Sequence, residues 1–294
     1  MIKTIINTEN VQDADVVFVS APYEKTASSH KGTARGPAAV INFLNTQIEF
    51  FDRTYKVEVN DFVKSAHINL SQIEELSPKH AYEAIKTNSQ KLVAQDKFIF
   101  LLGGEHAVSI GNLEALKDKY KAEDVTILHI DAHCDLRKDD SDYNDTPSEF
   151  AHSTVMHWAS GMGYKLVQVG LRSFSKEERD FFTDPKNNIT AFEWTKDTPS
   201  IEEILQAIKT KNIYISIDVD GFDPSVMPGT GTPVPGGLSW YYGLDLIERA
   251  IKEHELIGAD IVEVSPEPHT VITEYGAAQL AYNMLAHKFN SRFK

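Results

Sequence analysis

The chain has 294 residues, 41% of them hydrophobic, which is long enough to bury one large core. Its 29 basic and 43 acidic residues give a formal net charge of −14, which argues against binding to nucleic acid and favours cationic ligands. The single cysteine, Cys134, excludes an intramolecular disulfide and a thiolate metal cluster. Because we find neither a signal peptide nor an apolar run long enough to span a membrane, we expect a soluble cytoplasmic protein.

No repeat or low-complexity linker divides the sequence, so we expect one domain over residues 1–294. Short apolar runs alternate with longer amphipathic stretches, and this alternation predicts an α/β sandwich with a mainly parallel sheet. Helices are predicted to begin at Ser77-Pro78 and at Ser239. The predicted buried strands cover residues 15–20, 98–102, 125–130, 165–171, 213–217 and 261–264.

Polar side chains follow these runs at the ends where ligands collect in open parallel sheets. Three potential ligands occupy every second position of 131–135, so in extended backbone they point to one side, and 218–220 repeats the pattern. Singly, each residue has a simpler explanation as a turn cap or a hydrogen-bonded core group. Together they predict a metal site whose candidate ligands are His106, Asp131, His133, Asp135, Asp218 and Asp220.

These ligands are more numerous than one tetrahedral ion uses, so two bridging carboxylates would suit a pair of divalent cations. Carboxylates and imidazoles without a thiolate favour Mn²⁺, with Zn²⁺, Co²⁺ and Fe²⁺ as alternatives.

Three blocks of sequence resemble the ureohydrolase family, which includes arginase, agmatinase and formiminoglutamase. They are GGEHAVSIG at 103–111, DAHCDLR at 131–137 and SIDVDGFDPSVMPGTGTPVPGG at 216–237, with weaker agreement around Arg35, at 168–173 and at 260–266. The resemblance implies a three-layer α/β/α fold, two Mn²⁺ ions per subunit and a homo-oligomer, usually a trimer or hexamer.

The resemblance also implies a ligand set for each ion. One ion would be held by His106, Asp131, Asp135 and Asp218, and the other by His133, Asp131, Asp218 and Asp220. Asp131 and Asp218 would therefore bridge. His129 lies two residues before Asp131 on the same strand face, and we expect it to support the ligands or the core, with a direct function as the alternative.

The chemistry follows from the metal. Bound cations lower the pKa of water from 15.7 to roughly 7, which makes hydroxide available to attack a guanidinium carbon. Asp135 could then pass a proton to the departing amine. By resemblance, His152 is the proton shuttle to solvent and Glu263 meets the substrate guanidinium; the alternative for Glu263 is pairing with a neighbouring arginine.

Two positions bear on the substrate. Arg137 and Ser173 stand where arginase has an Asn and an Asp that recognise the amino-acid end of arginine. Both differences resemble agmatinases, so we expect hydrolysis of agmatine to putrescine and urea, a reaction of polyamine metabolism.

Other interpretations stay open. His269 replaces an Asp common in related enzymes, and Arg137 could attract a carboxylate, so guanidinobutyrate, arginine and formiminoglutamate are alternative substrates. A metal-binding scaffold without turnover is a further alternative, while a deacetylase-type hydrolase is disfavoured because such sites generally use one zinc ion. Residues 227–237 are predicted to form a structured loop beside the site, with a mobile lid as the alternative.

Overall fold

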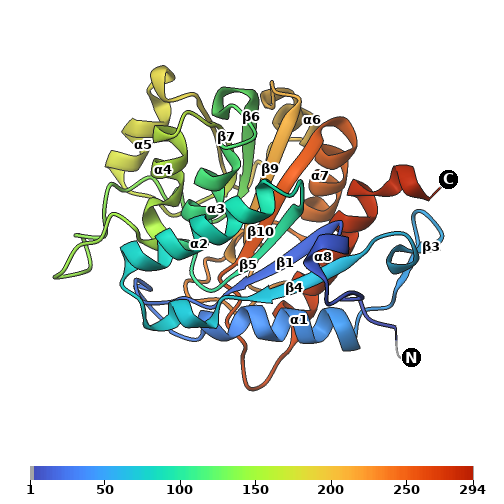
Figure 1. The fold of residues 1–294 in the computed structure, drawn as a ribbon. Helices are drawn as coiled ribbons and strands as arrows, with labels where there is room; N and C mark the ends of the chain where they lie inside the picture. The colour runs from blue at the N-terminus through green and yellow to red at the C-terminus, as the bar shows by residue number, and fades with distance from the viewer. Residues whose placement is uncertain (1–2, 294) are drawn as a thin grey trace.

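A sheet of eight parallel strands forms the centre of the computed structural model, which describes residues 3–293 (Figure 1). The strand order is β4-β1-β5-β10-β9-β6-β7-β8, and a separate antiparallel pair is made by β2 and β3. The strands are β1 Val16–Ala21, β2 Phe51–Asp52, β3 Val57–Glu58, β4 Ser65–Asn69, β5 Phe98–Gly103, β6 Val125–Ile130, β7 Lys165–Leu171, β8 Ile189–Glu193, β9 Asn212–Asp218 and β10 Glu255–Val262.

Helices cover both faces of the sheet (Figure 1). One core packs α1, α6, α7 and α8 against strand residues such as Phe100, and the other packs α2, α3, α4 and α5 against their alternate neighbours, such as Leu101. The expected three-layer α/β/α sandwich with a parallel sheet is confirmed. The helices are α1 Gly36–Thr46, α2 Pro78–Val93, α3 Val108–Leu116, α4 Val155–Gly161, α5 Lys176–Thr183, α6 Ile201–Ala207, α7 Trp240–Glu253 and α8 Ile272–Lys288.

Five of the six predicted strands agree with the structure to within one residue at each end. The sixth strand exists, but its predicted bounds 261–264 are wrong, because β10 begins at Glu255 and ends at Val262. Gly258 and the buried Asp260 interrupt the apolar pattern there, and Asp260 is satisfied by hydrogen bonds from the neighbouring strand. The edge strands β4 and β8 escaped prediction because they are short and only partly buried.

Both predicted helix starts are confirmed. Ser77 precedes α2, whose first residue is Pro78, and the Ser239 side chain accepts a hydrogen bond from the Tyr242 amide at the start of α7. The buried Ile247 on α7 faces the core as expected.

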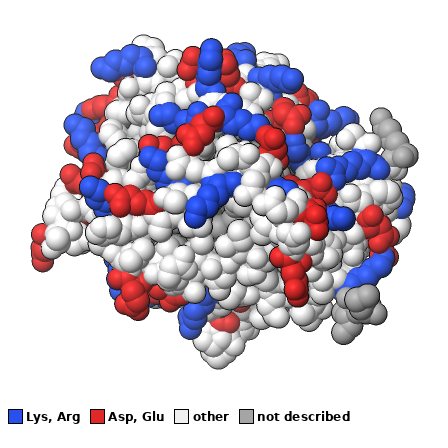
Figure 2. Space-filling view, viewed as in Figure 1, with Lys and Arg blue, Asp and Glu red and all other residues white. Residues whose placement is uncertain are grey.

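Acidic and basic side chains are intermingled on the face of the molecule that Figure 2 shows. Among residues 3–293, none of the helices combines the length and the apolar character needed to cross a bilayer.

Gly104 lets the chain turn sharply after β5. Its amide donates to the Ala21 carbonyl at 2.9 Å, and its carbonyl accepts from the Glu263 amide at 2.8 Å. A Cβ at this position would lie 2.2 Å from the Tyr23 carbonyl oxygen, so no other residue fits without a backbone shift. The turn after β5 is therefore packed between the end of β1 and the residues that follow β10. This packing fixes the position of His106, two residues further along the chain.

We predict that Gly104→Ala lowers the free energy of unfolding by about 1–3 kcal/mol, because the added methyl group overpacks a rigid backbone contact. Urea denaturation measures the change. Gly161→Ala is the matched control, since a Cβ there meets no atom within 4 Å on helix α4, and its stability should stay equal or rise by up to about 1 kcal/mol. Equal stability of Gly104→Ala and the wild type would contradict this account of the turn.

Candidate metal centre and active site

The six candidate ligands meet at the carboxyl edge of the sheet. His106 follows β5, Asp131 follows β6, and Asp218 is the last residue of β9. Glu263 follows β10, which lies between β5 and β9 in the sheet. Strands far apart in sequence therefore deliver these side chains to one place, as expected for parallel sheets.

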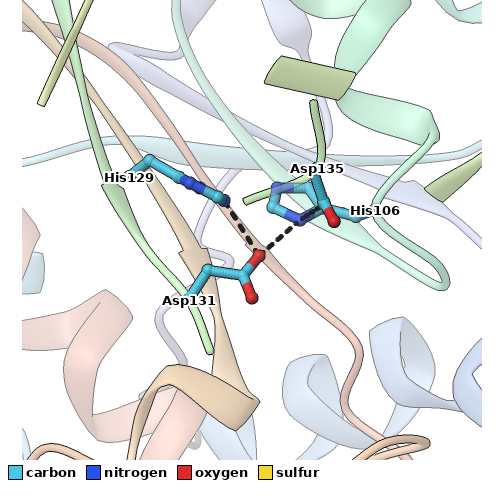
Figure 3. A group of neighbouring side chains, drawn as sticks. All are labelled: His106, His129, Asp131 and Asp135. Carbon is cyan, nitrogen blue, oxygen red and sulfur yellow. Dashed lines mark ion pairs between the residues drawn. The ribbon is translucent and has the colours of Figure 1, made fainter. Parts of the chain in front are cut away.

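The ligand atoms form two groups that share Asp131. In the first, one atom each from His106, His129, Asp131 and Asp135 lies within 4.8 Å of the others (Figure 3). His106 Nδ1 is 3.3 Å from Asp131 Oδ2 and 3.1 Å from Asp135 Oδ2. Asp218 Oδ2 lies slightly farther away, 3.7 Å from the same nitrogen.

The second group consists of Asp131, His133 and Asp220. His133 Nδ1 is 3.1 Å from Asp220 Oδ2 and 3.5 Å from Asp131 Oδ1. The shared carboxylate of Asp131 thus stands between two imidazole and carboxylate clusters, an arrangement suited to two cations side by side.

The predicted extended backbone at 131–135 is wrong at Asp135, although His133 forms a parallel bridge with Ser173 and the three side chains do converge. Strand β6 ends at Ile130, and Asp135 adopts a left-handed conformation with φ 53°. Similarly, Asp218 does not continue as a strand: its side chain accepts from the Asp220 amide and caps a 3₁₀ turn. The polar Asp side chain tolerates the left-handed conformation of Asp135, and residues in that conformation are frequent at functional sites.

The carboxylates of this site repel one another. Burial, followed by repulsion from Asp220 and Asp131, raises the pKa of Asp218 well above its ordinary value. Burial and Asp131 likewise raise the pKa of Asp135 to about 6. Burial opposes ionisation of Asp131 too, but the imidazoles of His129 and His106 outweigh it and hold the pKa of Asp131 well below its usual range. A cation between these groups would relieve the repulsion.

One buried ligand atom, His106 Nδ1, also lacks a hydrogen bond within the described part of the chain. An unsatisfied buried polar atom costs about 1–3 kcal/mol, and more if it is charged. A divalent cation would satisfy this atom and offset the charge of the surrounding carboxylates, so the residues present fit a metal centre.

A hydrogen-bonded chain behind His106 fixes which nitrogen faces the site. His106 Nε2 donates to Ser216 Oγ at 2.9 Å, and the Ser216 hydroxyl donates to Asp260 Oδ1 at 2.8 Å. Tyr214 donates to the other oxygen of Asp260 at 2.8 Å. Because Nε2 is held as a donor, Nδ1 is the nitrogen that faces the carboxylates and would bind a metal. One signal for this role is present in the sequence, because Ser216 lies two residues before Asp218 on one strand face.

His129 supports Asp131. The Gln168 amide nitrogen donates to the Cys134 carbonyl at 2.7 Å and to His129 Nδ1 at 3.0 Å. The proton of His129 consequently resides on Nε2, which lies 2.9 Å from Asp131 Oδ2. A protonated Nε2 cannot bind a metal, so this geometry favours the supporting role expected for His129.

A cavity of about 310 Å³ opens beside the second group. Its lining includes His133, Asp135 and His152, together with Arg137 and Ser173, whose positions set the substrate expectation. Thr232 belongs to the loop 227–237 that the sequence placed beside the site, whereas six lining residues were not singled out: Ser28, Tyr143, Ser153, Phe174, Ser175 and Glu178. They come from separate loops and from α5, so no local pattern relates them.

His152 lies at the wall of this cavity. Its Nε2 atom is 3.4 Å from Ser28 Oγ and 3.5 Å from the Tyr143 hydroxyl. Burial and the nearby His133 lower the pKa of His152 to about 4, so its ring is neutral at pH 7 and is a weaker base than a free imidazole.

Glu263 is buried beside His106 rather than paired with an arginine. Its Oε1 accepts from the His106 amide at 2.9 Å, and its backbone is left-handed with φ 63°. Burial and the nearby Glu105 carboxylate raise the pKa of Glu263 well above its ordinary value. The free-energy cost of ionising this buried carboxyl would be offset by a cationic group bound beside it.

The loop at 227–237 is anchored beside the site. Thr232 donates to Asp220 at 3.1 Å, and the Gly229 amide donates to Thr273 at 2.8 Å. These bonds favour a structured loop. His269, in contrast, is exposed in a turn between Glu267 and Thr270 and does not line the cavity.

We predict that Ser216→Ala weakens Mn²⁺ retention by roughly 10–100-fold, because His106 loses the acceptor that orients its ring. Dialysis against a graded series of chelator concentrations, followed by elemental analysis, measures this. Ser89→Ala is the control: Ser89 is also buried, but its hydroxyl has no partner among residues 3–293 and it lies on α2. Retention that is equal in both variants would refute the orienting role of Ser216.

Comparison with known proteins places this site in a family. A model of the arginase family matches residues 14–286. An N(1)-aminopropylagmatine ureohydrolase from Synechocystis sp. is 32% identical over 96% of this chain and 92% of its own length. An agmatinase from Chromobacterium violaceum is 29% identical over 97% of this chain and 87% of its own.

A solved structure shares the whole fold. The agmatine ureohydrolase of Thermoplasma volcanium superimposes with a TM-score of 0.83 at 25% identity, covering 98% of this chain and 94% of that one. The family match, the relatives and the shared fold together show that this chain is a ureohydrolase of the arginase family.

Proposed function

We propose that the chain hydrolyses agmatine to putrescine and urea with two Mn²⁺ ions, and that residues 1–294 act as one catalytic domain. The observation that supports this best is the pair of imidazole and carboxylate groups that share Asp131 beside a cavity. The relatives support a guanidino substrate, since both named proteins act on agmatine or a derivative of it.

The proposed ligand sets start from the two groups, omit His129 and add Asp218 as a second shared carboxylate, as the family resemblance implies. His106, Asp135, Asp131 and Asp218 would hold one ion, while His133, Asp220, Asp131 and Asp218 would hold the other. When bound, these cations would lower the pKa of water to about 7 and so supply a nucleophile at neutral pH. The carboxylate-rich donor set favours Mn²⁺ over softer ions.

The protein residues around the metals would then position the substrate and move protons. Glu263 would pair with the substrate guanidinium, because a carboxylate and a guanidinium form two parallel hydrogen bonds. Asp135 would carry a proton to the departing amine, and His152 would exchange protons between the cavity and solvent.

The cavity favours a substrate tail with an amine over one with a carboxylate. Its wall includes the buried carboxylate of Glu178 and the hydroxyl groups of Ser173 and Tyr143. Arg137, the one cationic side chain that could attract a carboxylate, is already paired with Asp142 and lies 3.9 Å from Glu178. Guanidinobutyrate and arginine would have to compete with these internal partners.

A second candidate substrate is N(1)-aminopropylagmatine. The relative that shares 32% identity bears this activity in its name, and the compound has the same guanidinium end with a longer cationic tail. The two substrates differ only at the end far from the metals.

We predict that Mn²⁺-loaded protein releases urea from agmatine with a higher kcat/KM than from guanidinobutyrate or arginine, because the cavity wall offers acceptors for an amine. A parallel assay adds N(1)-aminopropylagmatine, and formiminoglutamate with formamide as product. Preference for arginine over agmatine would overturn the substrate assignment. A lack of product from all five compounds would favour the scaffold interpretation.

We predict that Glu263→Gln lowers kcat/KM for agmatine on the order of a hundredfold, because a neutral amide stabilises the developing charge poorly, while bound metal is unchanged. Turnover assays and elemental analysis measure both. Glu274→Gln is the control, since Glu274 is also a buried glutamate but lies on α8, whereas Glu263 accepts a hydrogen bond from the candidate ligand His106. Near-normal turnover of Glu263→Gln would rule out the proposed role.

A further inference from the structure

A second, larger cavity adjoins the cavity beside the metal groups. The first, here called the inner cavity, contains His133 and Asp135 in its wall. The second, the outer cavity, has a volume of about 680 Å³ and contains neither of these residues. The two cavities share three wall residues, Arg137, Ser175 and Glu178. A molecule that passed this shared wall would occupy both spaces.

The side chain of Arg137 is held in the shared wall from several directions. Its guanidinium pairs with Asp142, lies 3.9 Å from Glu178 and is 5.9 Å from the centre of the Tyr143 ring. Asp142 and Tyr143 belong to the loop that follows Arg137 and projects from the left side of the molecule in Figure 1, and Glu178 belongs to α5.

The main partner of Arg137 is weakly held. The Asp142 side chain is 65% exposed, and ion pairs between exposed groups contribute little to stability. Arg137 is the longest of the three side chains in the shared wall, and the loss of its ion pair should cost little stability.

The outer cavity suits a cationic group. Its wall contains four carboxylates besides the shared Glu178. Besides the shared Arg137, Lys138 is the only lysine or arginine among the described residues of this wall. The four are Asp139, Asp142, Glu177 and Asp180. An amine that reached this space would find acceptors on several sides.

We propose that Arg137 determines specificity by limiting the length of the substrate tail. With Arg137 in the wall, the inner cavity holds a guanidine whose tail ends in one amine. Without its side chain, the outer cavity becomes the subsite for the second amine of a polyamine-extended guanidine. This inference rests on the proposed hydrolysis of agmatine-type guanidines and adds the residue that separates the short from the long substrate.

The test compares two substrates in three proteins. For wild type, Arg137→Ala and Arg137→Met, the quantity measured is kcat/KM for N(1)-aminopropylagmatine divided by kcat/KM for agmatine. We expect this ratio to rise about tenfold or more in Arg137→Ala, a change typical of added contacts along a substrate chain. In Arg137→Met the ratio should stay within about threefold of wild type, because methionine fills most of the same space without the charge.

Arg179→Ala is the matched control. Arg179 lies next to Glu178 on α5, pairs with Glu193 at 3.2 Å on the surface and lines neither cavity. Its removal takes away the same charge without opening the wall, so the substrate ratio should not change.

Each remaining outcome decides against part of the proposal. An unchanged ratio in Arg137→Ala would show that the wall does not limit the tail. An equal rise in Arg137→Met would assign the effect to charge repulsion and overturn the steric role. Failure of the wild type to hydrolyse either guanidine would refute the proposed function itself, which is a different result from turnover with an unchanged ratio.

Discussion

Carboxylates packed into a small buried space are the constraint on which the rest of this structure depends. Asp131, Asp135 and Asp218 are each at most 5% exposed, and they lie close enough to raise one another's free energy of ionisation. Such a group is stable only if cations or protons compensate the charge. Imidazoles supply part of that compensation, and the proposed metal pair supplies the rest. Catalysis and stability would thus draw on the same electrostatic interaction.

The parallel sheet builds this site by placing its support and its ligands in successive layers. In the register of the central strands, Ser216 on β9 lies beside His129 on β6 and beside Asp260 on β10. These three polar residues form a row beneath the ligands, and each is buried and hydrogen-bonded or ion-paired to a neighbour. The row orients His106 and Asp131 from below, and a rigid orientation is what metal centres require of their ligands.

The sequence alone predicted the layered fold and the positions of all six candidate ligands, because buried strands and their polar ends are local patterns. It could not predict that Asp135 turns the chain with a left-handed backbone, since that conformation depends on tertiary contacts. It also could not predict where β10 begins, because a buried Asp260 breaks the apolar pattern of this strand. The hydrogen bonds that stabilise Asp260 there come from another strand, β9. The cavity wall was hidden for the same reason, because Tyr143 and Glu178 meet only after the loop and α5 have packed together.

The most direct test of the central claim is the amount of Mn²⁺ bound per chain after saturation and removal of free metal, measured by elemental analysis. Two groups of ligands that share one carboxylate predict a value close to two. A value that levels off well below two at saturating Mn²⁺ would contradict the shared site and, with it, the mechanism proposed for this enzyme.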